Sequence, residues 1–451
     1  MAKQFCGRAF RRTPEDWSEW VEWLQAGLHS ETRWRLPLVF IGMLLGRGRR
    51  TVTSWLRAAG LQDDYSDYYY FIASVGRKSG ALATLLLRLL IRQLPLGERV
   101  ILAIDDTPTP RYGPYVEGAG LHHNPTSGPD DHKFVYGHLW VTLALVLRHP
   151  LWQGIGFPLC ARLYVKAKDV PKLSTLRGGW EFKTKLQLAA ELCEWALKIL
   201  APLKKPLWMV FDGAYAYRPL LKRILVPGVT VVSRLRKDAA LRTLPPRRKP
   251  GQVGGKRIYG RQAISLAKRA AHPQGWQTIE AVLYGGKLAT KTYKTFLATY
   301  AVVGGVIRVV LVREANGWQA FFCTDPNASV RDILECFADR SVIEQVFHDI
   351  KEVWGAGQQQ VRNVWSNIGC FHLNLWMHTL VELWAWNRAA DAIRDRSGSP
   401  WDDAERRPSH ADRRNALRRT VLQNEFQAVE VRHKIPKQLK TMFEALVLLA
   451  A

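Results

Sequence analysis

Acidic residues stand directly after two apolar segments of the sequence. Asp105 and Asp106 follow VILAI, and Asp212 follows PLWMVF. Short apolar runs rich in β-branched residues predict buried strands, and open α/β sheets place their functional sites at strand ends. These carboxylates are therefore candidates for one shared site. An Asp after a strand is also a common turn signal, so a purely structural role is the alternative.

A further carboxylate lies on a long amphipathic helix predicted for Val330 to Val353. Phe337, Arg340, Glu344 and Lys351 follow one another at spacings of three, four and seven residues. At about 100° per residue they fall within roughly a 60° arc, so one helix face carries Arg, Glu and Lys together. The opposite side supplies an apolar stripe of Val342, Ile343, Val346 and Ile350. The alternative is a solvated face with an Arg340–Glu344 ion pair.

Carboxylates in this number suit hard divalent cations. Mg²⁺ keeps several waters and takes only a few carboxylate oxygens together with phosphate oxygens. Two such ions, roughly 3.5 to 4 Å apart, activate a water or a 3′-hydroxyl and stabilise the leaving oxygen in phosphoryl transfer. Arg340 and Lys351 beside Glu344 would bind the flanking phosphates, Arg as a planar fork and Lys as a point charge. The residues thus predict metal-assisted chemistry on a phosphodiester.

The charge of the chain points to a polyanionic partner. Lys and Arg number 65 against 39 acidic residues, which gives a net charge of +26. Such an excess on a folded protein raises self-repulsion unless a polyanion neutralises it, and nucleic acid is the obvious one. A highly charged soluble surface or a ribosome-associated protein is the alternative. The hydrophobic content of 47% indicates a globular protein.

The N-terminal region, residues 1–95, is predicted to be helical and to bind DNA. Residues 36–61 contain an apolar helix, a turn with Gly46 and Gly48, and a second helix that stops at Gly60. This layout suits a helix-turn-helix, although helical hairpins are also common as packing units. The basic residues expected near DNA phosphates are Arg47, Arg49, Arg50 and Arg57.

The middle of the chain predicts a mixed α/β sheet flanked by helices. Residues 96–235 form the first part of this catalytic core, and residues 324–385 form the second part with the Glu344 helix. Residues 236–323 read as a β-rich insertion that begins with a basic loop at 236–261, for which a linker is the alternative. Residues 386–451 form a basic helical tail. The strand-like segments of the first part are 100–105, 139–147, 161–166, 206–212 and 229–235, with a helix at 182–200.

Other features exclude several classes of protein. The six cysteines are scattered without C-x-x-C spacing, which argues against a zinc ribbon or a disulfide framework and favours buried thiols in a reducing cytosol. His122, His123 and His138 form no recognised zinc pattern and are interpreted as loop or strand residues. The longest apolar runs are too short to cross a bilayer. We expect a cytoplasmic protein with no membrane partner.

With these residues in view, the chain resembles the DDE-type insertion-sequence transposases with an RNase H-like catalytic core, in the subgroup marked by Y-x2-R-x3-E-x6-K. The stretch here reads FADRSVIEQVFHDIK, in which Phe337 replaces the tyrosine and every spacing matches. The AIDDT and FDGAY segments match the first and second aspartates of the family. The first aspartate is assigned to Asp106, because it precedes Thr107, with Asp105 as the competing choice.

The resemblance covers roughly residues 98–385 and implies a function. It implies a cut-and-paste DNA transposase of bacterial, nucleoid-associated location, with Asp106, Asp212 and Glu344 as catalytic residues and ligands of two Mg²⁺ or Mn²⁺ ions. Its partners would be double-stranded DNA, both transposon ends and target, and a second copy of the chain in a homodimer. The alternatives are an inactive transposase that acts as a DNA-binding regulator and a stand-alone metal-dependent nuclease.

The same resemblance gives the insertion a role. In relatives it helps to hold a DNA hairpin end and stacks an extruded base on a tryptophan. Trp318, and after it Trp276, are the candidates by position. An aromatic plane suits an unstacked base. Because the chain has 18 tryptophans, a core role is the alternative for either residue.

Overall fold

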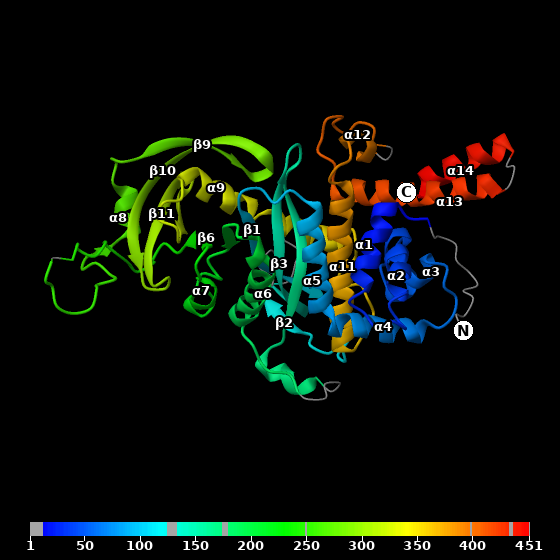
Figure 1. Ribbon diagram of the computed structural model, residues 1–451, viewed down its shortest axis with the longest axis horizontal. Coiled ribbons are helices and arrows are strands. Elements are labelled where there is room, and N and C mark those ends of the chain that lie inside the picture. Colours follow the sequence, from blue (N-terminus) through cyan, green and yellow to red (C-terminus); the bar gives the residue numbers. More distant parts are fainter. Residues whose placement is uncertain are drawn as a thin grey trace.

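The structure is a computed structural model that describes residues 12–123, 133–173, 179–248, 250–396, 399–432 and 436–450. Residues 15–93 are mostly helical: α1 (Glu15–Gln25), α2 (Arg35–Leu45), α3 (Val52–Ala58), α4 (Tyr65–Arg77) and α5 (Ser79–Gln93). On α1 the apolar residues recur at helical spacing, and all four, Trp17, Trp20, Val21 and Leu24, are buried. In Figure 1, α1 to α4 group on one side of the molecule, and α5 lies beside the central sheet.

A mixed sheet forms the centre of the fold, as predicted. Its first strands are β1 (Val100–Pro110), β2 (Gly120–His123), β3 (Phe134–His149), β4 (Gln153–Tyr164), β5 (Leu207–Phe211) and β6 (Val229–Leu235). β1 pairs antiparallel with β3, and β3 with β4, whereas β1, β5 and β6 run parallel to one another. The crossovers between parallel strands contain α6 (Lys185–Leu200) and α7 (Arg218–Ile224), with short 3-10 turns at Ala167–Lys172 and Ala201–Leu203. This arrangement is consistent with an RNase H-like core.

The strands of the predicted insertion continue this sheet. β12 (Gly317–Cys323) pairs with β6, and β11 (Gly305–Glu314) and β10 (Lys287–Tyr300) follow it outward. The edge is formed by β7 (Leu241–Arg242), β8 (Ala263–Ile264) and β9 (Gln277–Leu283), with α8 (Leu266–Ala271) and a 3-10 turn at Tyr284–Gly286 beside them. The basic loop between β7 and β8 projects from the far end of the molecule (Figure 1).

The long helix predicted for Val330 to Val353 is wrong, because the structure breaks it in two. α9 (Val330–Asp339) ends and α10 (Val342–Glu352) begins on either side of Arg340 and Ser341. Backbone bonds in the break connect residues three apart, from Ile343 to Arg340 and from Ser341 to Ala338. The Ser341 hydroxyl also donates to the Ala338 carbonyl (2.7 Å). A tightened turn of this kind changes the angle per residue, so the single charged face is interrupted.

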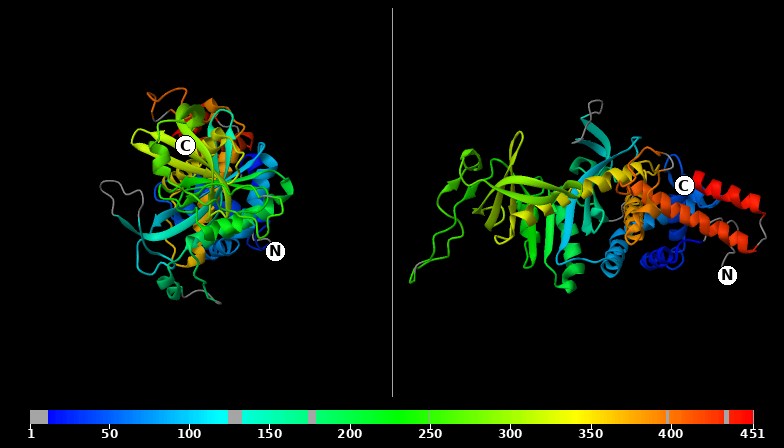
Figure 2. Two further views of the ribbon diagram at one scale, coloured as in Figure 1. Left: turned by 90° about the vertical axis from the view of Figure 1, so that its left-hand side faces the viewer. Right: turned by 90° about the horizontal axis from the view of Figure 1, so that it is seen from above.

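A buried helix joins the N-terminal region to the sheet. α11 (Val364–Ala385) is buried along almost its whole length and packs against α4 and β4. Glycines permit the close approach: a Cβ at Gly76 would lie 2.0 Å from the Trp365 carbonyl, and one at Gly369 would lie 2.1 Å from that of Ile72. Beyond α12 (Ala390–Ile393), α13 (His410–Arg432) and α14 (Lys437–Ala450) project as a helical pair (Figure 2).

Candidate active site

Two of the predicted carboxylates lie at the same edge of the central sheet. β1 and β5 are parallel neighbours, and their last registered pair is Ile104 with Phe211. Asp105 is the next residue of β1, and Asp212 directly follows the last residue of β5. Because the two parallel strands are in register up to this point, the fold brings these two positions together, although they are far apart in the sequence.

One guanidinium joins Asp105 to the carboxylate of the helix. Arg340 Nη1 donates to Asp105 Oδ2 at 2.8 Å, and Arg340 Nη2 donates to Glu344 Oε1 at 2.6 Å. The Asp105 and Arg340 side chains are largely buried, whereas the Glu344 side chain is 58% exposed. Burial raises the pKa of Asp105 to about 6 against the opposing effect of Arg340, and the charges of Asp106 and Glu344 raise it further. Anionic groups are therefore gathered around one cation.

Asp106 faces the other side of the sheet. Its Oδ2 accepts from Lys185 Nζ at 2.8 Å, and its Oδ1 accepts from the hydroxyl of Tyr215 at 2.6 Å. Lys185 is the first residue of α6, and Tyr215 belongs to the FDGAY segment after β5. Neighbouring strand residues point to opposite faces, so Asp105 shares a face with Glu344 and Asp106 does not. Asp105, the competing choice for the first aspartate, is therefore the one on the Glu344 face, and the assignment of Asp106 stays a prediction.

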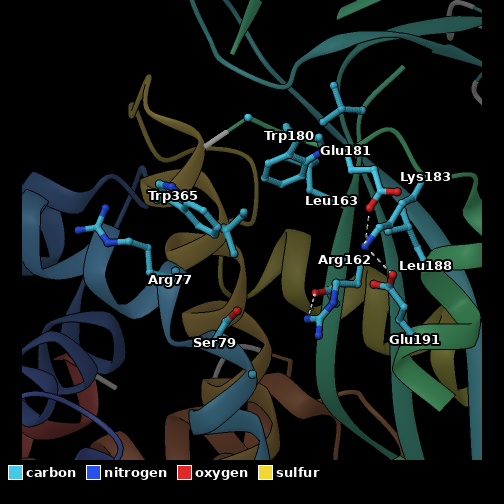
Figure 3. Close-up of a pocket in the computed structure, with 16 residues that line it drawn as sticks. Arg77, Ser79, Arg162, Leu163, Trp180, Glu181, Lys183, Leu188, Glu191 and Trp365 are labelled. Atoms are coloured by element: carbon cyan, nitrogen blue, oxygen red, sulfur yellow. Dashed lines mark hydrogen bonds and ion pairs between the residues drawn. The ribbon is translucent and has the colours of Figure 1, made fainter. Parts of the chain in front are cut away.

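A hollow on the Asp106 face shows which elements line that side. The register places Asp106 opposite Val141 on β3, and Val141 opposite Arg162 on β4. Arg162 lines a hollow of about 500 Å³ together with Trp180, Lys183 and Glu191 of the α6 region (Figure 3). Lys183 pairs with Glu191 at 2.7 Å in that hollow. This hollow is therefore separate from the group formed by Asp105, Arg340 and Glu344.

Asp212 lies in a basic hollow at the end of β5. This hollow, about 270 Å³, is lined by Asp212 and by three cationic residues of the β6 end, Arg234, Arg236 and Lys237. Among the described residues, Asp105, Asp212 and Glu344 do not form a group whose ligand atoms lie within 4.8 Å of one another. Their oxygens fit the donor set that hard divalent cations need. In this arrangement the Arg340 guanidinium bridges two of them.

The other residues of the helix motif lie in different environments. Phe337 is buried and packs on Phe321, with ring centroids 4.7 Å apart. It is therefore a core residue. Lys351 lies on α10 and is partly buried, and this burial lowers its pKa. Glu344 lines a cavity of about 690 Å³ that runs along α10 to His348.

A second cluster of ligand-type side chains lies further along the same cavity. Among the described residues, Asp349, His378 and His410 form the single group whose ligand atoms lie within 4.8 Å of one another, and all three are buried. The indole N–H of Trp354 donates to His410 Nε2 at 2.7 Å, so the Nδ1 of His410 carries the proton and donates to Glu382 (2.6 Å). Both ring nitrogens of His410 are thus engaged.

This cluster ties three helices together. Arg413 Nη1 donates to both carboxylate oxygens of Glu382, at 2.8 and 2.7 Å. Glu382 lies on α11 and Arg413 on α13, while Asp349 on α10 approaches His378 at 3.6 Å. Burial lowers the pKa of His410 to about 4, so its ring is neutral at pH 7. These bonds hold the three helices together, while the buried His378 Nδ1 and the Arg413 Nε and Nη2 atoms have no hydrogen-bond partner among the described residues.

Comparison with protein families identifies the chain. A family model described as DDE superfamily endonuclease matches residues 23–296, which is more than half of the 451 residues. This chain belongs to that family. Among curated proteins, no match is found. Family membership gives a nuclease-type function with DNA as the substrate, and the superfamily normally uses divalent metal ions. The match includes Asp105, Asp106 and Asp212 and ends before Glu344.

The predicted DNA contacts of this endonuclease lie in different settings. Arg47, Arg49 and Arg57 are exposed around the α2–α3 turn. Arg50 instead packs inward: its backbone N–H donates to Gln358 Oε1 (2.9 Å) and its guanidinium donates to the Gly48 carbonyl (2.7 Å). Burial lowers the Arg50 pKa. Arg50 therefore holds the turn against the core.

The two candidate tryptophans of the endonuclease also differ. Trp276 has the cations of Lys294 and Arg313 over its ring, at 4.7 and 4.6 Å from the centroid, and its indole N–H donates to the His272 carbonyl. Trp318 lies at the start of β12 with Lys237 at 5.2 Å from its ring. Lys237 also lines the hollow that contains Asp212. Through Lys237, Trp318 is therefore connected to a predicted site residue.

The two partners of Asp106 had only weak signals in the sequence. Tyr215 stands in the FDGAY segment, but nothing local shows that it bonds a residue of β1. Lys185 opens α6 after the Thr184 cap, and its partner Asp106 is 79 residues away. Among the described residues, no helix is long and apolar enough to cross a membrane.

Proposed function

We propose that this endonuclease is a DNA transposase that uses Asp105, Asp212 and Glu344 as its catalytic carboxylates. The observation that carries the proposal is the bridge from Arg340 to both Asp105 and Glu344. Carboxylates from separate elements gather around a cation only where charge repulsion is offset, and a divalent cation offsets it more strongly than a guanidinium. These three residues would hold two Mg²⁺ or Mn²⁺ ions.

Each group in the site has a part in the proposed reaction. Bound divalent ions supply Lewis acidity at the scissile phosphate and a lowered pKa for the attacking water. Arg340 then has its planar fork available to a phosphate oxygen, and Lys351 on α10 supplies a second positive charge. Glu344 is the most exposed of the carboxylates and lies in a cavity open to the substrate. Strand transfer would follow when a released 3′-hydroxyl attacks target DNA.

The remainder of the molecule supports DNA binding in this proposal. Arg47, Arg49 and Arg57 would contact phosphates of a terminal inverted repeat, and Trp318 would stack on an unpaired base near Asp212. The net charge of +26 supplies the long-range attraction. We further propose that two copies of the chain act together on two transposon ends, as the resemblance implies, in the cytoplasm at the nucleoid.

The test is a cleavage and joining assay with DNA that contains the genomic sequences flanking the gene. Wild-type protein with Mn²⁺ should cut at the element ends and join them to a target plasmid, whereas Asp212→Asn and Glu344→Gln should bind the same DNA without cutting it. Cutting without joining by the wild type would identify a stand-alone nuclease. Binding without cutting by the wild type would identify a regulator. Equal cutting by the two variants would refute the carboxylate assignment.

A further inference from the structure

Three exposed aromatic residues and an exposed leucine gather beyond the end of β1. Tyr115 is 75% exposed, Leu121 53%, Phe134 55% and Tyr136 37%. Large apolar side chains in this number are costly in water unless a partner covers them. They come from the loop after β1 and from the paired strands β2 and β3, so the fold has brought them together.

The pairing of β2 and β3 explains why these side chains share a face. Leu121 is registered with Tyr136, and His123 with Phe134. Paired residues point to the same side of a sheet, as do residues two apart on one strand. The hydroxyl of Tyr136 also donates to the Gly113 carbonyl (3.4 Å), which connects this face to the loop containing Tyr115. Tyr115, Leu121 and Tyr136 line a hollow of about 650 Å³.

Cationic side chains surround the same hollow. Lys168, Lys172 and Arg362 line it, and the ammonium of Lys166 donates to the Leu121 carbonyl at its edge. Asp169 is buried and pairs with Lys172 at 2.7 Å, and Glu117 is the other acidic residue of the lining. Cations outnumber acids, so the hollow combines aromatic rings with positive charge. Aromatic rings beside cations are what bind a nucleic acid strand with free base faces.

The strand that contains the proposed catalytic aspartate leads along the chain toward the hollow. β1 continues from Asp105 to Pro110, its last residue. At about 3.4 Å per residue this distance is roughly 17 Å, or about five base-pair steps of B-form DNA. The lining of the hollow begins four residues further along the chain, at Pro114.

We propose that this aromatic hollow binds an unpaired DNA strand that flanks the cleavage site. The inference rests on the proposed function, because it takes the bound DNA to be the substrate of the carboxylates. Duplex DNA presents phosphates outward and keeps its base faces stacked, so it would contact the lysines but leave the rings exposed. An unpaired strand offers both phosphates and base faces. The occupant that matches both features is thus single-stranded.

The test compares binding of a forked duplex with binding of a blunt duplex of the same sequence, in EDTA so that no DNA is cut. Tyr115→Ala and Phe134→Ala should each weaken fork binding by about fivefold or more, since stacking on one ring supplies that factor, and should leave blunt-duplex binding unchanged. Tyr115→Phe keeps the ring and should bind like the wild type. Tyr70→Ala is the matched control, because Tyr70 on α4 is also 75% exposed.

The outcomes separate this inference from the proposed function. Unchanged fork binding by Tyr115→Ala and Phe134→Ala, or an equal loss on fork and blunt DNA, would overturn the inference while the proposed function stands. A change in oligomeric mass in place of a change in fork binding would show that the face joins two copies of the chain, which also overturns it. Failure of the wild type to bind either DNA would overturn the proposed function itself.

Discussion

Asparagine at position 105 should lower DNA cleavage by about 10³-fold or more, whereas asparagine at position 106 should lower it by no more than about 100-fold. The two residues are neighbours in the sequence, of the same type and on the same strand, so each variant controls for the other. Asp105 shares Arg340 with Glu344, and Asp106 bonds Lys185 and Tyr215 on the opposite face. The pair thus tests which face of the sheet is catalytic.

The structure sets the expected magnitudes. Loss of a residue that acts only in the transition state lowers the rate by about 10³-fold or more, which we expect for Asp105→Asn. Its unfolding free energy should change little, because burial raises the pKa of Asp105 to about 6 and the ionised form is disfavoured in the fold. Asp106→Asn weakens a bond to Lys185, which is 41% exposed, and one to buried Tyr215. We expect it to lose about 1 to 3 kcal/mol of stability, with the Lys185 contribution reduced by solvent screening.

The assay has two readouts on the same preparations. Mn²⁺-dependent nicking of a supercoiled plasmid containing the element ends gives the activity, and urea unfolding followed by tryptophan fluorescence gives the stability. Outer residues around a metal site typically alter activity by about 10- to 100-fold, so Asp106→Asn should stay within that range. If Asp106→Asn is the inactive variant and Asp105→Asn nicks DNA normally, the assignment from the face of β1 is refuted.

Four further predictions follow from individual contacts. Tyr215→Phe should cost about 1 to 2 kcal/mol in urea unfolding, because Asp106 loses its phenolic donor; an unchanged midpoint would contradict this. Arg340→Gln should lower the Mn²⁺ concentration for half-maximal nicking, because the guanidinium no longer competes for the Asp105 and Glu344 oxygens, and should also lower the maximal rate; a higher half-maximal concentration would count against the proposed metal ligands. If Arg49 and Arg57 contact phosphates, Arg49→Ala and Arg57→Ala should each make the plot of log DNA-binding constant against log salt concentration less steep by about 0.9. An unchanged slope would show that the α2–α3 turn is not part of the DNA interface. Burial lowers the pKa of His372 to about 4, so the neutral ring stabilises the fold. His372 should therefore contribute about 3 kcal/mol to the stability lost as pH decreases from 6.5 to 4, and His372→Gln should lose less stability than the wild type over this range; an equal loss would show that other groups are responsible.

Several features of this protein follow from local sequence alone. The apolar runs before Asp105 and Asp212 predict strands, and both are present as β1 and β5. The predicted end of the first strand at residue 105 is wrong, because pairing with β3 continues β1 to Pro110. The i,i+4 spacing of Arg340 and Glu344 predicts the ion pair observed between them. These features depend on side chains only a few residues apart, so periodicity and spacing are enough to reveal them.

Other features were decided by the tertiary structure. Alternation along β1 requires Asp105 and Asp106 to face opposite sides, but the choice of side depends on α6 and α10, which pack against the sheet from far along the chain. The partners of Asp106, Lys185 and Tyr215, are 79 and 109 residues away. The helix break at Arg340 and Ser341 is likewise absent from the sequence pattern, which is continuous and predicts one helix. The sequence determined which residues could do the chemistry. Only the packing of distant elements decided which of them face one another, because alternation along a strand fixes that neighbouring side chains point to opposite faces but not which helix covers each face.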